Sequence, residues 1–298
     1  MNKPQKPFLK WVGGKTQLFD KILPKIQTDI RNYHEPFLGG GSILLAVLSL
    51  QRYNKIKVHE KIYAYDLNEN LINLYKHVQN NVEELYDSIQ KYTNEFNSIT
   101  GTAINRSPSC EEEAKTSKES YYYWIREKYN KSIINSIERS SLFLILNKTC
   151  FRGLYREGPR GFNVPFGHYK NPSIITKQEL YDVSSLIRDV IFQAVDFTES
   201  FKNICVGDFV YIDPPYAPET ASSFVKYTES GFDLNKHKSL FHEIKKLNEN
   251  KVKFVMSNAK VDIVTKEFAD FKCEEVKARR AINAKNPESF TKEVLIYN

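Results

Sequence analysis

One four-residue motif joins two hydrogen-bond acceptors to a flat ring: Asp213-Pro214-Pro215-Tyr216. It follows an apolar segment, residues 209–212, that is typical of a buried strand. Because a residue before proline is pushed out of the helical region, the prolines hold Asp213 and Pro214 extended at the end of that strand. The Asp213 carboxylate and the Pro214 carbonyl can then accept both N–H groups of an exocyclic amine. Tyr216 adds a face on which a planar base can stack.

This pair of acceptors favours one kind of reaction. Hydrogen bonds to both N–H groups favour the pyramidal form of an aromatic amine, whose lone pair is otherwise delocalised into the ring. The amine can then attack a sulfonium methyl group in line, with no covalent enzyme intermediate. The alternative is a tight turn after a buried strand, with Tyr216 in the core.

A second motif is a glycine turn between an expected strand and an expected helix, Glu35-Pro36-Phe37-Leu38-Gly39-Gly40-Gly41-Ser42. Glycine permits positive φ and close backbone approach, so a cofactor can lie against this turn. Asp66 ends the next strand and can accept both ribose hydroxyls, although a solvated acid at a strand end is the alternative. A nicotinamide site has similar parts, but its usual G-x-G-x-x-G spacing is absent, since position 44 is Leu.

A third motif lies near the start of the chain, in residues 7–15. Trp11 and Lys15 lie on either side of a Gly-Gly turn. This spacing suits a lysine that meets a carboxylate, such as the methionine end of a cofactor. An anchoring loop with a surface lysine is the alternative for this motif taken alone.

The elements that must position these motifs alternate along the chain. Expected strands cover residues 33–35, 62–66, 190–194, 209–212, 254–256 and 294–297, and expected helices cover 42–50, 71–89 and 240–247. This alternation predicts an α/β fold: a doubly wound, mainly parallel, Rossmann-like sheet, with ligands at the carboxyl ends of its strands.

The middle third breaks this rhythm. Residues 92–120 are polar and are expected to be a loop or insertion. An expected helix at 121–130 and an apolar stretch at 133–146 lead into a segment rich in Gly, Pro, Arg and aromatic residues, 147–172. We therefore expect a mostly helical second domain, residues 80–189, inserted between two parts of a catalytic domain, 1–79 and 190–298.

Composition narrows the class of protein. The 298 residues carry a formal net charge of +7, which favours a polyanionic partner. No apolar run approaches the roughly 18 residues that span a bilayer, so we expect an intracellular protein with no membrane partner. The four cysteines are widely spaced and predict no metal site.

The three motifs, in this order, resemble the Dam-type adenine-N6 DNA methyltransferases, which are the D12 class and alpha group. The resemblance extends through residues 146–156, 162–167, 256–258 and 293–297, and covers nearly the whole chain apart from 92–120. It implies S-adenosyl-L-methionine as cofactor, N6 of a flipped adenine as acceptor, and the inserted domain as the target-recognition domain.

By this resemblance, Asp213, Pro214, Pro215 and Tyr216 hold the flipped adenine. The cofactor-binding residues that it implies are Trp11, Lys15, Glu35, Pro36, Phe37, Gly39, Gly41, Asp66, Phe197 and Asp213. Residues 150–152 and 157–160 depart from the side chains associated with GATC readers. The target therefore stays open between GATC, CATG and a longer site.

Residues 147–170 have the composition of a DNA-reading segment, with five basic side chains against one acidic and several aromatic rings between them. We expect DNA contacts from Lys148, Phe151, Arg152, Leu154, Arg156, Arg160, Asn163 and Pro165. Arginine can read guanine in the major groove and an apolar side chain can wedge into a base step, so Arg156 is the expected base contact and Phe151 or Leu154 the wedge. The alternative is a basic hairpin whose aromatic rings pack on the main domain.

Other functions share parts of this pattern. Cytosine N4, an RNA adenine and a protein glutamine amide offer similar amines, while a catalytically silent DNA-binding protein and a nicotinamide-dependent oxidoreductase use similar scaffolds. No Pro-Cys pair supplies the thiol that cytosine C5 methylation requires. We expect double-stranded DNA as partner, a cognate restriction endonuclease as a candidate second partner, and a monomer or weak dimer. A phage or a host regulatory role fits the chain equally well.

Overall fold

The computed structural model describes residues 3–169, 171–218, 232–279 and 290–298. The chain forms two compact units. The first unit comprises Met1–Gln5, Lys15–Leu67 and Asp189–Asn298. The second comprises Lys6–Gly14 and Asn68–Arg188.

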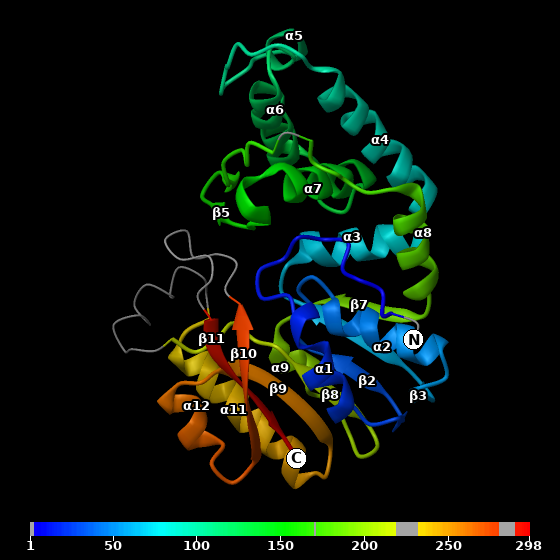
Figure 1. Ribbon diagram of the computed structural model, residues 1–298, viewed down its shortest axis with the longest axis vertical. Helices are drawn as coiled ribbons and strands as arrows, with labels where there is room; N and C mark the ends of the chain where they lie inside the picture. Colours follow the sequence, from blue (N-terminus) through cyan, green and yellow to red (C-terminus); the bar gives the residue numbers. More distant parts are fainter. Residues whose placement is uncertain (1–2, 170, 219–231, 280–289) are drawn as a thin grey trace. The chain divides into compact units, whose positions relative to one another are not determined.

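A seven-stranded sheet forms the centre of the first unit (Figure 1). Its strands are β2 (Tyr33–Glu35), β4 (Ile62–Asp66), β7 (Val190–Ala194), β8 (Phe209–Ile212), β9 (Lys253–Ala259), β10 (Lys272–Arg279) and β11 (Phe290–Tyr297). Their order is β10-β11-β9-β8-β2-β4-β7. Strands β7, β4, β2, β8 and β9 pair in parallel, and β11 is antiparallel to both of its neighbours. The predicted doubly wound, mainly parallel α/β fold is confirmed.

The described part of the first unit also contains helices and a small strand pair. They are η1 (Thr16–Leu18), α1 (Phe19–Ile22), η2 (Leu23–Lys25), α2 (Ser42–Arg52), α9 (Phe197–Ser200), α11 (Leu234–Glu249), α12 (Asp262–Glu267), and β1 (Asp29–Ile30) paired with β3 (Lys57–Val58). Buried side chains of α9, α11 and α12 join those of β8, β9 and β11 in one apolar cluster. This cluster is the core on that face of the sheet.

The direction of winding reverses at β2. From β2 the chain crosses through α2 to β4, on one side, whereas from β8, on the other side of β2, it crosses through α11 to β9. Because such crossovers are right-handed, α2 and α11 must cover opposite faces of the sheet. The carboxyl ends of β2 and β8 therefore form a topological switch point, which is where ligands bind in open α/β sheets.

A buried carboxylate ties the start of β8 to the residues before β2. Asp208 Oδ1 accepts hydrogen bonds from Arg31 Nε and Asn32 Nδ2, both at 2.9 Å, and its Oδ2 lies 3.3 Å from His34 Nε2. Burial alone would raise the pKa of Asp208, but hydrogen bonding from His34 and Arg31 outweighs it and holds that pKa well below its usual range. Asp208 therefore fixes the two central strands at the end opposite to the switch point.

Asp208→Asn is expected to lower the free energy of unfolding at pH 7 by about 2–4 kcal/mol, because buried polar groups lose a charged acceptor. The folded-state pKa is depressed, so this contribution is fully present above the ordinary carboxyl pKa of 3.8 and is lost as pH falls through the folded-state value. Urea unfolding of both proteins at pH 7 and pH 3 measures the difference. A difference that is equally large at the two pH values would contradict this account.

The second unit is mainly helical. Its elements are α3 (Glu69–Asn80), α4 (Val82–Ser98), α5 (Glu111–Ala114), α6 (Lys118–Lys131), α7 (Ile137–Thr149), η3 (Phe151–Gly153), α8 (Lys177–Leu186), and a hairpin of β5 (Glu157–Gly158) and β6 (Gly161–Phe162). Side chains of Asn68, Ser117, Ser136 and Thr176 cap α3, α6, α7 and α8. In the part of the chain that the structure describes, no helix combines the length and apolar character needed to cross a bilayer.

Two expectations for this region need correction. The single helix expected at 71–89 is two helices, α3 and α4, which meet at Asn81. The expected loop at 92–120 contains the end of α4 and all of α5, because Tyr92 and Phe96 continue the buried stripe of Leu85 and Ile89. Spacings of three and four residues place these side chains on one helix face.

The second unit also extends beyond the predicted range 80–189. It includes α3 and residues 6–14. Helix α3 packs against α7, and the main chain of Lys10 exchanges two hydrogen bonds with the Asn147 amide, at 2.9 and 2.6 Å. These contacts explain why α3 and residues 6–14 belong to the second unit.

Candidate active site

Three carboxyl groups follow or end the central parallel strands of the first unit. Glu35 ends β2, Asp66 ends β4 and Asp213 follows β8. Because β4, β2 and β8 are adjacent and parallel, their carboxyl ends share one edge of the sheet. The sheet thus brings two of the three sequence motifs to the switch point.

The glycine turn after β2 has the backbone that its sequence predicts. Gly39 and Gly41 have φ angles of 49° and 65°, in the left-handed region that favours glycine. The Gly39 N–H donates to Asp66 Oδ2 at 2.9 Å, so the turn is fixed to the end of β4. Helix α2 begins directly after Gly41. Its N-terminus and the turn can accommodate the polar end of a cofactor.

Lys15 forms an ion pair with the carboxylate of the main motif. Its Nζ lies 2.8 Å from Asp213 Oδ2, and the Lys15 side chain is only 4% exposed. The Lys15 backbone N–H donates to Ser42 Oγ at 3.1 Å, which joins this segment to the start of α2. Lys15, the last residue of the third motif, therefore contacts both of the other motifs.

The charge state of Asp213 reflects opposing influences. Burial is the largest and raises the pKa, Lys15 lowers it, and the charge of Glu293 raises it again. The result is a pKa of about 6. At pH 7 the carboxyl is mostly ionised and able to accept hydrogen bonds, whereas it becomes protonated as pH falls through 6.

The chain after Asp213 is held by two side chains from neighbouring strands. The Ala217 N–H donates to Asn258 Oδ1 at 3.2 Å, and the Tyr216 hydroxyl donates to Glu293 Oε2 at 2.7 Å. The Lys15 ammonium lies 5.0 Å from the centre of the Tyr216 ring. Sequence reasoning gave no role to Asn258 or Glu293, and the only signal was that both lie in segments covered by the family resemblance.

Several other predicted cofactor residues are buried or half-buried. Glu35 is 2% exposed and accepts a hydrogen bond from the Tyr33 hydroxyl at 2.8 Å. Burial, with a smaller effect of the nearby Asp213 charge, raises the pKa of Glu35 well above its usual range. Phe37 is half-buried and stacks on Phe197, which belongs to the apolar core. Pro36 is also buried.

Trp11 belongs to the second unit. Its ring stacks on Tyr155, with ring centres 5.9 Å apart, and lies 6.3 Å from Phe143. In the same segment, the Lys10 ammonium donates to the Lys148 carbonyl at 3.0 Å and lies 3.9 Å above the Tyr169 ring. Burial lowers the pKa of Lys10, and it lowers the pKa of Lys148 as well, with a further contribution from the Lys10 charge.

Four of the eight predicted DNA contacts lie in or beside the hairpin of the second unit. Arg156 is exposed, and its Nε donates to Asn163 Oδ1 at 2.6 Å. Arg160 is exposed in the turn between β5 and β6, and Pro165 is exposed after β6. Lys170, which was counted among the basic residues, lies outside the described residues.

A short turn before the hairpin presents an exposed aromatic ring. Phe151 is 43% exposed, and the Arg152 guanidinium lies 5.2 Å from its ring centre. Arg152 has φ of 56°, a left-handed backbone that is uncommon for a residue with a side chain. Leu154, the other predicted wedge, is only half-buried.

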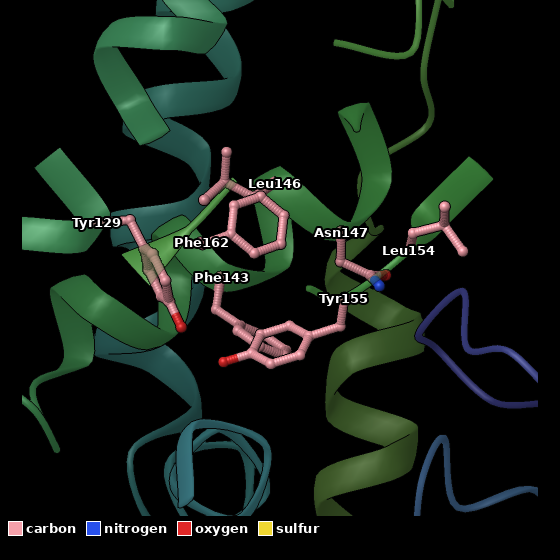
Figure 2. Close-up of a pocket in the computed structure, with 7 residues that line it drawn as sticks. All are labelled: Tyr129, Phe143, Leu146, Asn147, Leu154, Tyr155 and Phe162. Atoms are coloured by element: carbon pink, nitrogen blue, oxygen red, sulfur yellow. The ribbon is translucent and has the colours of Figure 1, made fainter. Parts of the chain in front are cut away.

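An aromatic cluster supports the hairpin from inside the second unit. Figure 2 shows a small pocket lined by Tyr129, Phe143, Leu146, Asn147, Leu154, Tyr155 and Phe162. The Tyr155 ring lies 5.5 Å from Phe143 and 5.7 Å from Phe162, between helix α7 and strand β6. The aromatic residues of this segment therefore have two uses, since Phe151 is exposed while Tyr155 and Phe162 pack inside.

A doubly wound sheet with a glycine turn after β2 and an Asp-Pro-Pro-Tyr motif after β8 is typical of one class of protein, the methyltransferases with a Rossmann-like fold.

The family model described as D12 class N6 adenine-specific DNA methyltransferase matches residues 11–282. The chain is 38% identical over 290 residues to the Type II methyltransferase M.MjaIII of Methanocaldococcus jannaschii, covering 94% of this chain and 93% of that protein. It is 32% identical over 287 residues to the DNA adenine methylase of Escherichia coli K12, covering 95% and 91%. The chain belongs to the D12-class N6 adenine-specific DNA methyltransferases, which confirms the resemblance found in its motifs.

Proposed function

We propose that the protein transfers a methyl group from S-adenosyl-L-methionine to N6 of an adenine flipped out of a short duplex sequence. The observation that carries this proposal is the ion pair at the end of β8, where Asp213 Oδ2 lies 2.8 Å from Lys15 Nζ and the next residue in the chain, Pro214, supplies a carbonyl acceptor. These acceptors match the two N–H groups of an exocyclic amine. The family match supports adenine as the base and DNA as its carrier.

The residues at the switch point have the chemistry to hold this cofactor. Lys15 can meet its carboxylate, Asp66 its ribose hydroxyls, and the turn at Gly39 and Gly41 allows close approach of its backbone. When bound, S-adenosyl-L-methionine supplies the electrophilic sulfonium methyl group. Trp11, Glu35, Pro36, Phe37 and Phe197 complete the proposed cofactor set.

The chain's own contribution to the reaction is to bind and orient the amine. Asp213 and Pro214 accept its N–H groups, which localises the nitrogen lone pair for in-line attack. Tyr216 stacks on the flipped base, and Pro215 keeps this segment extended. Because N6 inside a duplex cannot reach an enclosed site, the base must first leave the helix.

The second unit is the proposed target-recognition domain. Its exposed hairpin, with Arg156, Arg160 and Asn163, suits contacts to base edges and phosphates. Phe151 suits the wedge that supports flipping, and Lys148, Arg152, Leu154 and Pro165 complete the proposed DNA contacts. GATC and CATG are both candidate targets. The name of one relative, a Type II methyltransferase, supports a place beside a cognate restriction endonuclease. An intracellular protein that acts as a monomer or weak dimer completes the proposal.

Arg156→Ala is expected to weaken discrimination at one base pair of the target by about 1–3 kcal/mol, provided that Arg156 reads a guanine edge. The pairing with Asn163 holds the guanidinium in one orientation, which suits bidentate recognition. Methylation rates on duplexes substituted at each position measure the effect. Equal slowing on every duplex would identify Arg156 as a phosphate contact instead. Lys131→Ala, at an exposed position on α6, is the control.

The proposal as a whole is tested by methylating unmethylated genomic DNA with the purified protein and S-adenosyl-L-methionine. Sequencing that reports N6-methyladenine at each position should find the mark in one short motif. Parallel assays with radiolabelled cofactor should show a clear preference for duplex DNA over RNA. Methyl transfer to cytosine N4 or to RNA, with no modified adenine in DNA, would overturn the proposed function.

A further inference from the structure

The hydroxyl of Tyr216 has two carboxylates near it. It donates to Glu293 Oε2 at 2.7 Å, and its effect on the pKa of Asp213 marks that second carboxylate as another acceptor within its reach. Glu293 lies on β11, opposite Ala259 of β9, and is 9% exposed. A buried glutamate on a separate strand thus contacts the aromatic residue of the main motif.

A phenol has one proton and donates it to one acceptor at a time. If the Tyr216 proton went to Asp213, it would occupy a lone pair that the amine of the substrate needs. In the structure the Tyr216 hydroxyl lies 2.7 Å from Glu293 Oε2, so Glu293 offers this proton an acceptor other than Asp213. The same hydrogen bond fixes the end of the Tyr216 ring, and therefore the plane on which a base stacks.

We infer that Glu293 is a positioning residue, which holds the Tyr216 hydroxyl away from Asp213 so that the Asp213 carboxylate stays free to accept the substrate amine. This inference rests on the proposed function, because it assigns a partner to the residues that bind the adenine. The family match and the motif resemblance gave Glu293 no such role.

A carboxylate at Glu293 has an electrostatic cost for the ionised form of Asp213. Asp213 faces the Lys15 ammonium, the Tyr216 hydroxyl and the negative charge of Glu293, and its charge acts in turn on buried Glu35 and Tyr211. The Glu293 charge raises the pKa of Asp213, and Lys15 opposes it. Removal of the charge at Glu293 alone should therefore lower the pKa of Asp213.

Glu293→Gln separates the charge from the hydrogen bond. The amide oxygen still accepts the Tyr216 proton, so kcat at pH 8 should stay within about threefold of wild type, given the modest value of one hydrogen bond. The acid limb of the kcat/KM profile should move to lower pH because a negative charge beside Asp213 is gone. Glu275→Gln is the matched control, since it removes an exposed charge from the adjacent strand β10.

Glu293→Ala removes the acceptor, so the Tyr216 hydroxyl is free to donate to Asp213. We expect kcat to fall about tenfold, with a smaller change in KM. Side chains in direct contact, such as Glu293 and Tyr216, commonly have interaction energies large enough for a rate change of this size. Adding Tyr216→Phe removes the competing hydroxyl and keeps the stacking ring. The double variant should therefore recover several-fold of the lost kcat, which a merely structural role of Glu293 does not predict.

The outcomes are distinct. Identical pH profiles for Glu293→Gln and Glu275→Gln, or no recovery in the double variant, would overturn the role of Glu293 while the methylation of adenine stands. Thermal unfolding of each variant identifies any loss of the fold, and the isosteric Glu293→Gln keeps the test decisive if Glu293→Ala unfolds. A wild-type protein that methylates no adenine would overturn the proposed function, and this inference with it.

Discussion

Asp213→Ala is expected to lower methyl transfer by about 10³-fold or more while most of the DNA affinity remains, because it removes a group that acts on the reacting nitrogen. The Asp213 carboxylate is the one ionised acceptor of the motif, whereas the DNA contacts are expected from the second unit. Single-turnover methylation and DNA binding at equal salt concentration measure the two effects separately.

Two further variants test whether the loss of turnover is specific to the Asp213 carboxylate. Asp213→Asn keeps the shape of the side chain but replaces one acceptor oxygen with a donor, so it should remain strongly impaired. Asp262→Ala removes a carboxylate that is 88% exposed on α12 and should leave turnover unchanged. Substantial turnover by Asp213→Ala would refute the role assigned to this carboxylate.

Lys15→Met is expected to lower kcat/KM for S-adenosyl-L-methionine at pH 7 by about 10²- to 10³-fold. The variant lacks the cation proposed to meet the cofactor carboxylate, and it leaves the Asp213 carboxylate without its Lys15 partner, which disfavours the ionised form. Lys15 lowers the pKa of Asp213, so without it this pKa should rise above the wild-type value of about 6. Part of the carboxylate is then protonated at pH 7 and cannot accept both N–H groups.

The pH profile distinguishes this cause from a simple loss of cofactor contacts. The wild-type acid limb is expected near pH 6, and the Lys15→Met limb at higher pH, with partial recovery of activity by pH 9. Lys266→Met, at a lysine that is 78% exposed on α12, is the control. An unmoved limb would mean that Lys15 does not set the charge state of Asp213.

The sequence predicted most of the sheet, because its central strands are short apolar runs that end at polar or glycine-rich residues. Strand β10 was missed, since its sequence is mostly charged and it lies at the edge of the sheet. The break between α3 and α4 was missed as well. A helical pattern continues across Asn81, so the tertiary packing of the two helices decides where the chain turns.

The sequence predicted those parts of the candidate site that lie at the ends of parallel strands. Parallel neighbours carry their last residues to the same edge, and this places Asp66 and Asp213 there without any knowledge of packing. The pairing of Lys15 with Asp213 was not predicted, because the expected partner was the cofactor. The roles of Asn258 and Glu293 depend on which strands become neighbours and in which register, and local sequence does not encode this.

The position of β11 has a consequence for how the protein assembles. It follows β10 in sequence, yet it lies between β10 and β9. Strand β10 pairs with β11 in this sheet, so β10 can join the sheet together with β11 or after it. The pairing of β11 with β9 spans the residues of β10, and such less local pairing slows folding. Since Glu293 lies on β11, the hydrogen bond that orients the ring of Tyr216 can form only once β11 has joined the sheet.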